Sequence, residues 1–235
     1  MLRFVALLSL AIFSSTSFAE GRARGLLVAT NKATLSSELS ARVIGISKTM
    51  GESFNKGDLL VQLDCRLYEA QRDKIAAETH VAKIRLDNTK QLNKLRSIGM
   101  LEVAIAESEF KKNQAELSIS ELNVERCTIF APFNGVVDQV DIQTFEIVQQ
   151  QQAVLNIVDQ RQLEAEIIVP SNWMAWLSLN QEITLKVEET GQSLLAFVSQ
   201  IGPSIDPTSQ TLQLRAHIST LPEKVLPGMS VIAKF

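Results

Sequence analysis

The chain has 235 residues, a formal net charge of −3 and a pI near 5.6, which is length enough for about two domains. The acidic balance argues against nucleic acid as the main partner, because proteins that bind nucleic acid present a basic face. The chain has only two histidines and one tyrosine, and it contains no nucleophile elbow, phosphate loop or metal-ligand cluster. We therefore predict that it is not an enzyme and that it has no catalytic residues, no cofactor and no metal site.

The first nineteen residues have the pattern of a targeting segment. Arg3 precedes an apolar run over residues 4–13, and Ser17 and Ala19 form a small-x-small cleavage site. The apolar run is shorter than the roughly 20 residues that a membrane-spanning helix needs. We predict a cleaved signal peptide over residues 1–19 and therefore an exported chain. The alternative is an uncleaved signal that acts as an N-terminal anchor.

Two distant stretches, residues 42–64 and 127–159, read as two halves of one small β unit. Each has a β-branched run, an early glycine, a polar turn and a closing apolar run that ends in aspartate. A half-sheet cannot bury its apolar face alone, so the halves should close on each other as a β-sandwich made of residues 25–64 and 128–159. The aligned positions are Gly45 with Gly135, Leu59-Leu60 with Val154-Leu155, and Leu63-Asp64 with Val158-Asp159.

Residues 65–127, between the halves, are predicted to form an α-helical hairpin. The segment is rich in Glu, Lys, Gln and Ala and has no proline, so a helical interpretation suits it best. Gly99 separates a first helix over residues 66–97 from a second over 101–125. The second helix carries a coiled-coil seam at alternating three- and four-residue spacing, whereas the apolar stripe of the first is weak. The seam residues are Val103, Ala106, Phe110, Asn113, Leu117, Ser120 and Val124.

Residues 160–235 have the pattern of a small antiparallel β-barrel. Strands are expected at 163–169, 183–187, 195–201, 211–218 and 230–235, with turns at regular intervals. A short amphipathic helix follows Pro170 and carries Trp173 and Trp176. These two tryptophans are either core residues with one partly exposed face or a binding site for a partner or small molecule.

Cys65 and Cys127 flank the predicted hairpin, so both should lie at its base. An exported protein meets an oxidising compartment, where a disulfide between them would close a loop of about sixty residues. Bridging also requires Cα atoms within roughly 7 Å. The alternative is a pair of unbridged buried thiols.

Four motifs resemble those of the periplasmic adaptor family, the HlyD-like membrane fusion proteins that serve RND-type and related efflux pumps. They occur in the family's order across nearly all of the chain that follows the signal. Residues 45–64 are similar to the first lipoyl-like half, and residues 129–137 (IFAPFNGVV) to the APF-x-G signature of the second half. Residues 201–207 (IGPSIDP) with Thr211, and residues 226–229 (LPGM), resemble two turns of the family's barrel.

The resemblance implies a mainly β fold: a lipoyl-like barrel-sandwich hybrid interrupted by a coiled-coil hairpin, then a small antiparallel barrel. It implies a non-catalytic subunit of a tripartite efflux or secretion pump, located in the periplasm and associated with the inner membrane through its transporter partner. The expected partners are an RND-type inner-membrane transporter, an outer-membrane channel and further copies of the chain in a trimeric or hexameric ring.

The hairpin tip is the expected partner-binding site, because apolar residues at an exposed turn have little reason to be there in a monomer. The alternative is that they pack within the hairpin itself. Two tip positions depart from the family pattern: Gln91 and Glu102 stand where many adaptors carry an Arg and a Ser. The predicted partner-binding residues are Leu95, Ile98, Gly99, Met100, Leu101 and Glu102.

Two further functions stay open at this stage. One is an adaptor-like periplasmic protein with altered or lost channel docking, which the two tip departures suggest. The other is a carrier domain for a covalently attached cofactor. The carrier hypothesis is disfavoured, because the acceptor lysine belongs on the hairpin that joins the halves, whereas Lys56 lies in a turn of the first half.

Overall fold

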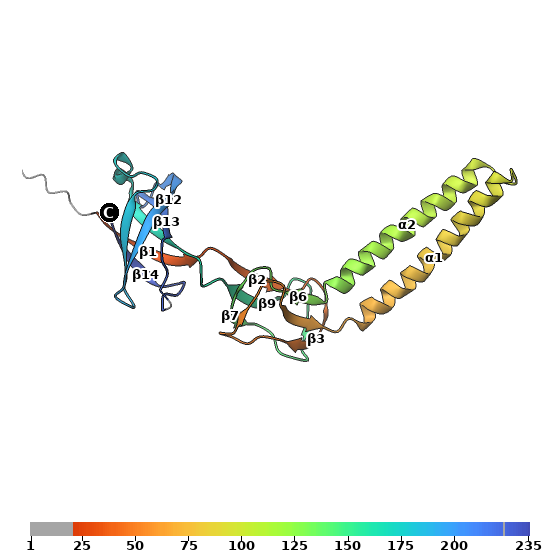
Figure 1. Cartoon of the computed structure of the whole chain (residues 1–235), viewed down its shortest axis with the longest axis horizontal. Helices are drawn as coiled ribbons and strands as arrows, with labels where there is room; N and C mark the ends of the chain where they lie inside the picture. Colours follow the sequence, from red (N-terminus) through yellow and green to blue (C-terminus); the bar gives the residue numbers. More distant parts are fainter. Residues whose placement is uncertain (1–20, 223) are drawn as a thin grey trace, which may run out of the picture. The chain divides into compact units, whose positions relative to one another are not determined.

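The computed structural model of the chain describes residues 21–222 and 224–235 (Figure 1). The predicted signal peptide over residues 1–19 lies outside these residues. The described chain divides into two compact units, one made of residues 21–28 with 164–235 and one made of residues 29–163. None of the helices described in these ranges is both long and apolar enough to cross a membrane.

The first unit is built on a closed barrel of six strands in the order β1-β10-β13-β12-β11-β14. Apolar and polar residues alternate along its strands, which places alternate side chains inside the barrel. The interior is therefore packed with aliphatic residues that are almost fully shielded from solvent, among them Leu27, Ile167, Leu185, Val198 and Leu214. The strands are β1 (Arg22–Ala29), β10 (Leu163–Pro170), β11 (Glu182–Val187), β12 (Ser193–Asp206), β13 (Thr211–Ile218) and β14 (Ser230–Lys234).

The assignment of residues 25–29 to the sandwich is wrong, because β1 is the sixth strand of the barrel and pairs with β14. Ala23 and Leu27 on β1 are buried. Without this strand, β10 and β14 would be open edges, and closure of the barrel satisfies their backbone hydrogen bonds. Gly25 permits the close approach of β10, since a Cβ there would lie 2.5 Å from the carbonyl oxygen of Glu166.

The second unit contains two four-stranded sheets that share one hydrophobic core. Both sheets mix strands from before and after the helices, so neither half of the sequence forms a complete sheet alone. One sheet has the order β2 (Lys32–Ser36), β9 (Ala153–Val158), β7 (Gly135–Val140) and β4 (Ser53–Phe54). The other has the order β6 (Thr128–Phe130), β5 (Leu59–Leu63), β3 (Ala41–Ile46) and β8 (Ile147–Val148).

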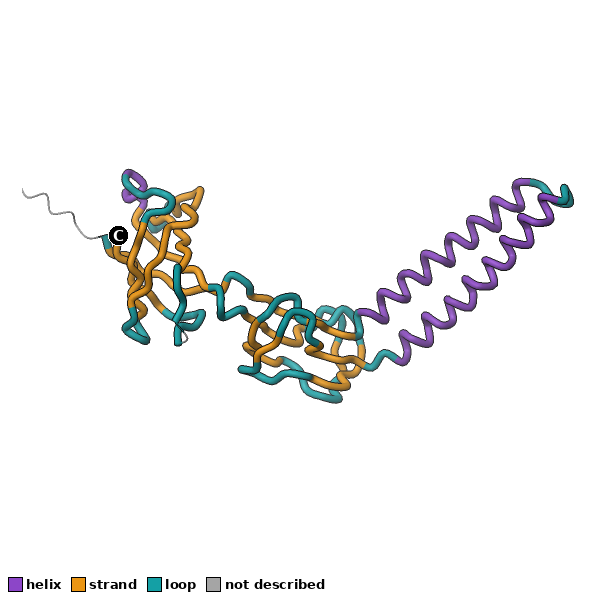
Figure 2. Tube along the Cα trace, in the orientation of Figure 1, coloured by secondary structure: helices purple, strands orange, loops and turns teal. Residues whose placement is uncertain are grey.

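Two helices, α1 (Arg66–Lys94) and α2 (Met100–Glu125), project from this pair of sheets and lie side by side (Figures 1 and 2). All seven seam residues predicted on α2 are buried or half-buried, so the predicted packing face of α2 is correct. The first helix ends at Lys94, three residues earlier than predicted. Its shielded positions also follow three- and four-residue spacing: Tyr68, Arg72, Ile75, Thr79, Ala82, Leu86, Thr89 and Asn93.

Candidate functional site

The hairpin tip, residues 95–102, carries a group of three strongly exposed apolar side chains. Leu95, Met100 and Leu101 are 74%, 72% and 69% exposed, and Gly99 and Glu102 are exposed beside them. Aliphatic side chains held in water at a turn are unfavourable for a free protein, so such a group is typical of a surface that a partner covers.

Hydrogen bonds hold the backbone of the tip in one shape. The Asn93 side-chain amide donates to the Ile98 carbonyl at 2.9 Å, and the Ser97 amide donates to the Leu92 carbonyl at 3.0 Å. Ile98 itself is half-buried and lines a groove of about 360 Å³ between the helices, together with Leu92 and Ile105. The six predicted residues therefore divide: Ile98 packs partly within the hairpin, and the other five are exposed. The exposed residues are Leu95, Gly99, Met100, Leu101 and Glu102.

A second set of apolar residues lies along the outer faces of both helices, and the sequence prediction missed it. On α2, the exposed large apolar residues are Leu101, Ile105, Ile119 and Leu122. They lie at alternating four- and three-residue spacing, with Ser108, Lys112 and Ala115 at the positions between Ile105 and Ile119. On α1, Leu67, Val81, Ile84 and Leu92 are also exposed. The signal was present in the sequence as a second periodic stripe on α2, but we assigned only the stripe that faces α1.

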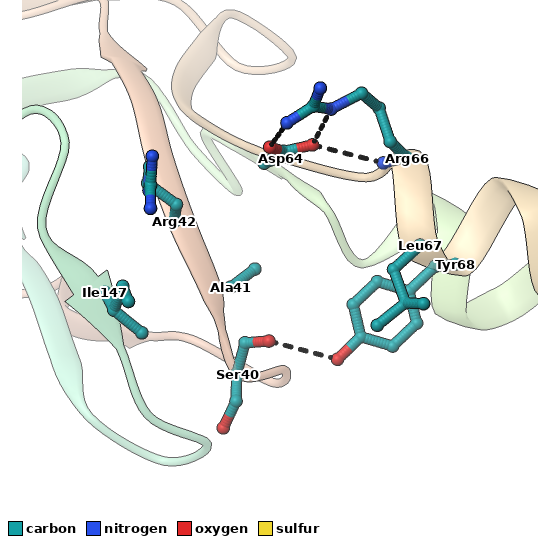
Figure 3. Close-up of a pocket in the computed structure, with 8 residues that line it drawn as sticks. All are labelled: Ser40, Ala41, Arg42, Asp64, Arg66, Leu67, Tyr68 and Ile147. Carbon is teal, nitrogen blue, oxygen red and sulfur yellow. Dashed lines mark hydrogen bonds and ion pairs between the residues drawn. The ribbon is translucent and has the colours of Figure 1, made fainter.

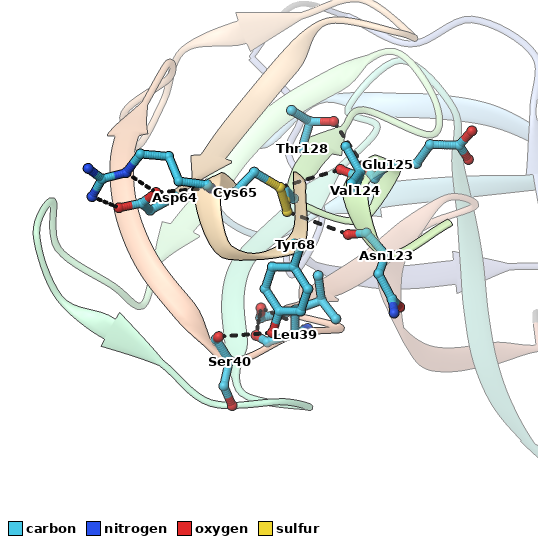
Figure 4. The surroundings of a disulfide bond; sticks show 12 residues. Leu39, Ser40, Asp64, Cys65, Tyr68, Asn123, Val124, Glu125 and Thr128 are labelled. Atoms are coloured by element: carbon cyan, nitrogen blue, oxygen red, sulfur yellow. Dashed lines mark hydrogen bonds and ion pairs between the residues drawn. A yellow bond between two sulfur atoms is a disulfide. The ribbon is translucent and has the colours of Figure 1, made fainter. Parts of the chain in front are cut away.

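At the opposite end of the hairpin, a disulfide joins Cys65 to Cys127 (Figure 4). Their Cα atoms are 5.8 Å apart, within the usual range for a disulfide. Cys127 is buried in the core shared by the two sheets, and Cys65 packs against that core. The disulfide thus fastens the start of α1 and the end of α2 to each other and to the sheets.

Polar contacts reinforce this junction. The Tyr68 hydroxyl donates to the Ser40 carbonyl at 3.2 Å, and Arg126 forms an ion pair with Glu38 at 2.8 Å. Each contact joins a helix end to the loop that precedes β3. Together with the disulfide, these contacts fix both helix ends to the sheets. The base of the hairpin is therefore held in place when a partner binds at the far end.

Asp64 occupies the turn into α1. Its carboxylate accepts hydrogen bonds from the Arg66 guanidinium at 2.9 and 2.6 Å and from the Arg66 amide at 3.3 Å. These bonds lower the pKa of Asp64 to about 2, because they favour its charged form. The residue at the N-cap position is Cys65, which makes no side-chain cap bond, so Asp64 acts from one position earlier.

Figure 3 shows the open groove beside this turn, with a volume of about 520 Å³. Its polar side chains are those of Ser40, Arg42, Asp64, Arg66 and Tyr68. The Asp64 carboxylate is already paired with Arg66, and no nucleophile is placed beside a general base in this groove. Nor do three or more His, Cys, Asp or Glu side chains gather to hold a metal ion within residues 21–222 and 224–235.

The two tryptophans form an aromatic cluster at one end of the barrel. Trp173 and Trp176 follow β10, on and just beyond the short helix η1 (Ser171–Ala175), and both rings contact Phe235. Trp173 is half-buried, whereas 47% of Trp176 is exposed. The two rings therefore pack together, and the cluster presents one face to solvent.

Comparison with known proteins places this architecture. The CusB-like, beta-barrel domain family matches residues 163–235. The nodulation protein NolF of Rhizobium meliloti is 25% identical over 83% of this chain and 57% of its own length. The multidrug resistance protein MdtA of Yersinia enterocolitica is 24% identical over 89% of this chain and 54% of its own length. The chain thus spans a little over half the length of these curated relatives.

Two solved structures share the fold at low sequence identity. A MacA-MexA chimeric protein containing the Pseudomonas aeruginosa MexA alpha-hairpin domain is 18% identical, with a TM-score of 0.79 over 92% of this chain and 80% of its own. The membrane fusion protein Spr0693 of Streptococcus pneumoniae R6 is 16% identical, with a TM-score of 0.75 over 91% of this chain and 97% of its own. The matched domain thus shows that residues 163–235 form a CusB-like barrel, and the two solved structures show that the chain shares the fold of the membrane fusion protein Spr0693.

Proposed function

We propose that the chain is a periplasmic adaptor subunit of a tripartite efflux or secretion pump. In this role it links an inner-membrane transporter, of the RND type, to an outer-membrane channel by packing and assembly rather than by catalysis. The observation that carries the proposal is the hairpin itself. Its exposed apolar tip lies at the end of two helices of 29 and 26 residues, and the base is tied to the sheets by a disulfide and polar contacts.

The length of the hairpin suits a bridge. At 1.5 Å per residue, helices of this length extend roughly 40 Å. The two helices bury very little of their surface against each other, so the hairpin contributes little to the stability of the fold. The hairpin instead holds the tip away from the sheets, so that Leu95, Met100 and Leu101 can meet the channel.

The pair of sheets is the lipoyl-like barrel-sandwich hybrid of this proposal, assigned to residues 30–64 and 128–159, and the hairpin is the coiled-coil domain of residues 65–127. These units pack side by side into a trimeric or hexameric ring. Exposed apolar residues of α2 such as Ile105 and Ile119 support lateral contacts, because they offer apolar surface that a neighbouring copy could cover.

Export by the signal over residues 1–19 places the protein in the periplasm. There it is held at the inner membrane through its transporter. The names of MdtA and NolF refer to multidrug resistance and to nodulation, so two relatives of similar identity are named for different processes. We infer that the transporter, rather than the adaptor, selects what is transported.

One alternative keeps the same fold but changes the docking. Glu102 places an exposed negative charge at the tip, and Gln91 is exposed at the last turn of α1. An adaptor-like protein that has changed or lost its channel partner would also show these features. The experiment that tests the proposal separates the two functions.

The test is purification of a tagged chain from mildly solubilised membranes of its native host, followed by identification of the bound proteins. The proposal predicts that a transporter and an outer-membrane channel purify with it. Leu101→Asp should retain the transporter and lose the channel, because a charge would replace an exposed leucine that the channel covers on docking. Met50→Asp, a matched change at an exposed site before β4, should retain both partners.

Recovery of the transporter alone with the unaltered chain would support the adaptor-like alternative. Recovery of neither membrane protein would contradict both. If Leu101→Asp retains the channel as well as Met50→Asp does, docking at the tip is wrong even though the bridging role holds.

A further inference from the structure

The disulfide lies where the two strands that carry the hairpin leave their sheet. β5 and β6 are neighbours, with Gln62 in register with Thr128, and the Leu63 amide donates to the Cys127 carbonyl at 2.9 Å. Cys65 is the residue before α1, and Cys127 is the second residue after α2. The bond between them therefore marks the border between a well-packed sheet and a weakly packed hairpin.

Both sulfurs lie against the last turn of α2. The Cys65 sulfur is 3.6 Å from the Val124 carbonyl oxygen, and the Cys127 sulfur is 3.5 Å from the Asn123 carbonyl oxygen (Figure 4). As thiols, the two cysteines would find acceptors here for their S–H groups. A thiolate would instead face carbonyl oxygens at the negative end of the helix dipole, which is unfavourable.

The two cysteines differ in their access to solvent. Cys65 is half-buried, whereas Cys127 is 2% exposed. A thiolate from outside therefore reaches Cys65, and the buried Cys127 is the sulfur that must leave as a thiolate. Since that charge would be unfavourable, exchange in the folded chain is slow. The chain has two cysteines in all, so the bond cannot rearrange to a third. Each redox state of the pair persists once it is formed.

The two redox states differ in the hairpin rather than in the sheets. The core shared by the sheets is built from aliphatic residues, among them Leu60, Val61 and Leu155, which are completely shielded from solvent. Reduction does not change these side chains, and a buried Cys127 thiol still packs as a small apolar group. Because β5 and β6 stay paired, the two sulfurs also stay close together. The sheets should therefore keep their fold as a dithiol.

The hairpin depends more strongly on the bond. Reduction removes a cross-link over 62 residues. The base then keeps the hydrogen bond of Tyr68 to Ser40 and the ion pair of Arg126 with Glu38. Both members of that ion pair are exposed, so its contribution is small. The reduced hairpin should therefore loosen at its base while the sheets below it remain folded.

We propose that formation of the Cys65–Cys127 disulfide is a checkpoint for assembly. Oxidation makes the hairpin competent to dock on the channel, and reduction withdraws that competence while both units stay folded. In the oxidation, the two thiols give two electrons and two protons to a disulfide-bearing donor. The donor becomes a dithiol as the two cysteine sulfurs form their bond. The reduction is the reverse exchange with a dithiol, through a mixed disulfide at Cys65. A thiol-oxidising reaction must therefore act on the chain before the channel docks.

The docking step rests on the proposed function, whereas the loosening of the hairpin does not. If the unaltered chain captures no channel, the proposed function fails. Measurements on the purified chain still decide whether the bond controls the hairpin.

The first test reduces the purified, folded chain with dithiothreitol and counts the free thiols by alkylation and mass spectrometry. Reduction should be about tenfold or more slower than in concentrated urea, because the folded chain shields Cys127. Dibromobimane, which becomes fluorescent when it bridges two neighbouring thiols, should then label the reduced chain. Hydrogen exchange of the reduced chain should be about tenfold faster in the first turn of α1 and the last turn of α2. β9 and β13 should stay protected.

The second test compares docking. The double variant Cys65→Ser, Cys127→Ser should retain the transporter and lose most of the channel when the tagged chain is purified from native membranes. Leu214→Ala, which destabilises the barrel and leaves the disulfide in place, is the matched control and should retain both partners. Circular dichroism establishes that each variant is folded.

Several results would overturn the proposal. Unchanged exchange along α1 and α2 after reduction would show that the hairpin does not depend on the bond. Loss of protection in β9 or β13 would show that reduction unfolds a whole unit rather than the hairpin. Reduction as fast in buffer as in urea would mean that neither redox state persists. Equal capture of the channel by the serine variant and by the unaltered chain would remove the checkpoint.

Discussion

The barrel and the hairpin bury their residues in opposite ways. Barrel residues such as Leu185, Leu214 and Ala233 are completely shielded from solvent, and six closed strands surround them. The hairpin buries only Thr79, Ala82 and Leu86 on α1 and Ala106 and Ser120 on α2. The barrel therefore supplies its own stability, whereas the hairpin gains little from the contact between its helices.

The polar contacts between the helices do not compensate for the small apolar surface that the hairpin buries. The Arg85–Glu109 ion pair spans the two helices at 3.1 Å, but both side chains are well exposed, and exposed pairs typically contribute less than about 1 kcal/mol. The Thr79 hydroxyl, which lies 3.1 Å from the Asn113 carbonyl, is a further cross-helix contact. We infer that the stability of the hairpin depends on the contacts at its base and on the partner that covers its outer faces.

The largest expected effect is at the base. Replacing both Cys65 and Cys127 with serine removes a cross-link over 62 residues, and we expect the free energy of unfolding of the second unit to fall by roughly 4 kcal/mol. Urea denaturation measures the loss. Hydrogen exchange should rise along α1 and α2 and stay unchanged in β13, and equal changes in both regions would contradict the account.

In the barrel, Leu214→Ala should lower the free energy of unfolding by about 3 kcal/mol, because closed strands on every side cannot collapse into the space. Thermal and urea unfolding monitor the change. Leu195→Ala is the matched control on the outer face of the same barrel, and it should cost less than about 0.5 kcal/mol. Similar losses for both leucines would show that the barrel interior is not the source of its stability.

In the hairpin, Leu86→Ala should cost about 2 kcal/mol, at the low end for a buried leucine, because half-buried neighbours let water or side chains fill the space. The matched control is Leu92→Ala, an exposed leucine of the same helix. Hydrogen exchange of α1 measures the local effect. A loss for Leu86→Ala larger than that for Leu214→Ala would reverse the comparison between the two regions.

The smallest effect concerns Asp64. Its hydrogen bonds to Arg66 lower its pKa from 3.8 to about 2, so folding favours the charged form. The resulting stability is present above the ordinary pKa and is lost as the pH falls from about 4 toward 2. The difference in unfolding free energy between the unaltered chain and Asp64→Asn should therefore shrink over that interval. A difference that grows on acidification would contradict this role.

The sequence predicts best those elements whose pattern is local. The bounds of β13 agree with the prediction residue by residue, because polar turns bracket an alternating run. The seam of α2 is also correct, since its spacing is visible in one helix. These features need no knowledge of which distant segment packs against them.

What could not be predicted depends on distant partners. β1 reads as a strand, but only closure of the barrel against β10 and β14 assigns it to that unit. The shielded face of α1 includes Arg72, Thr79 and Asn93, so apolar spacing alone does not reveal it. At the tip, the sequence does not distinguish half-buried Ile98 from exposed Leu101, because the tip's hydrogen bonds decide which side chain turns inward.

The central claim is that the hairpin tip meets an outer-membrane channel. The most direct measurement is photo-crosslinking in living cells with a probe at Glu102, followed by identification of the captured protein. A matched probe at Asp87, exposed midway along α1, controls for position on the hairpin. The account predicts that the probe at residue 102 captures an outer-membrane channel and that the probe at residue 87 does not. Capture of only further copies of the chain or the transporter from residue 102, or of no partner, would contradict it.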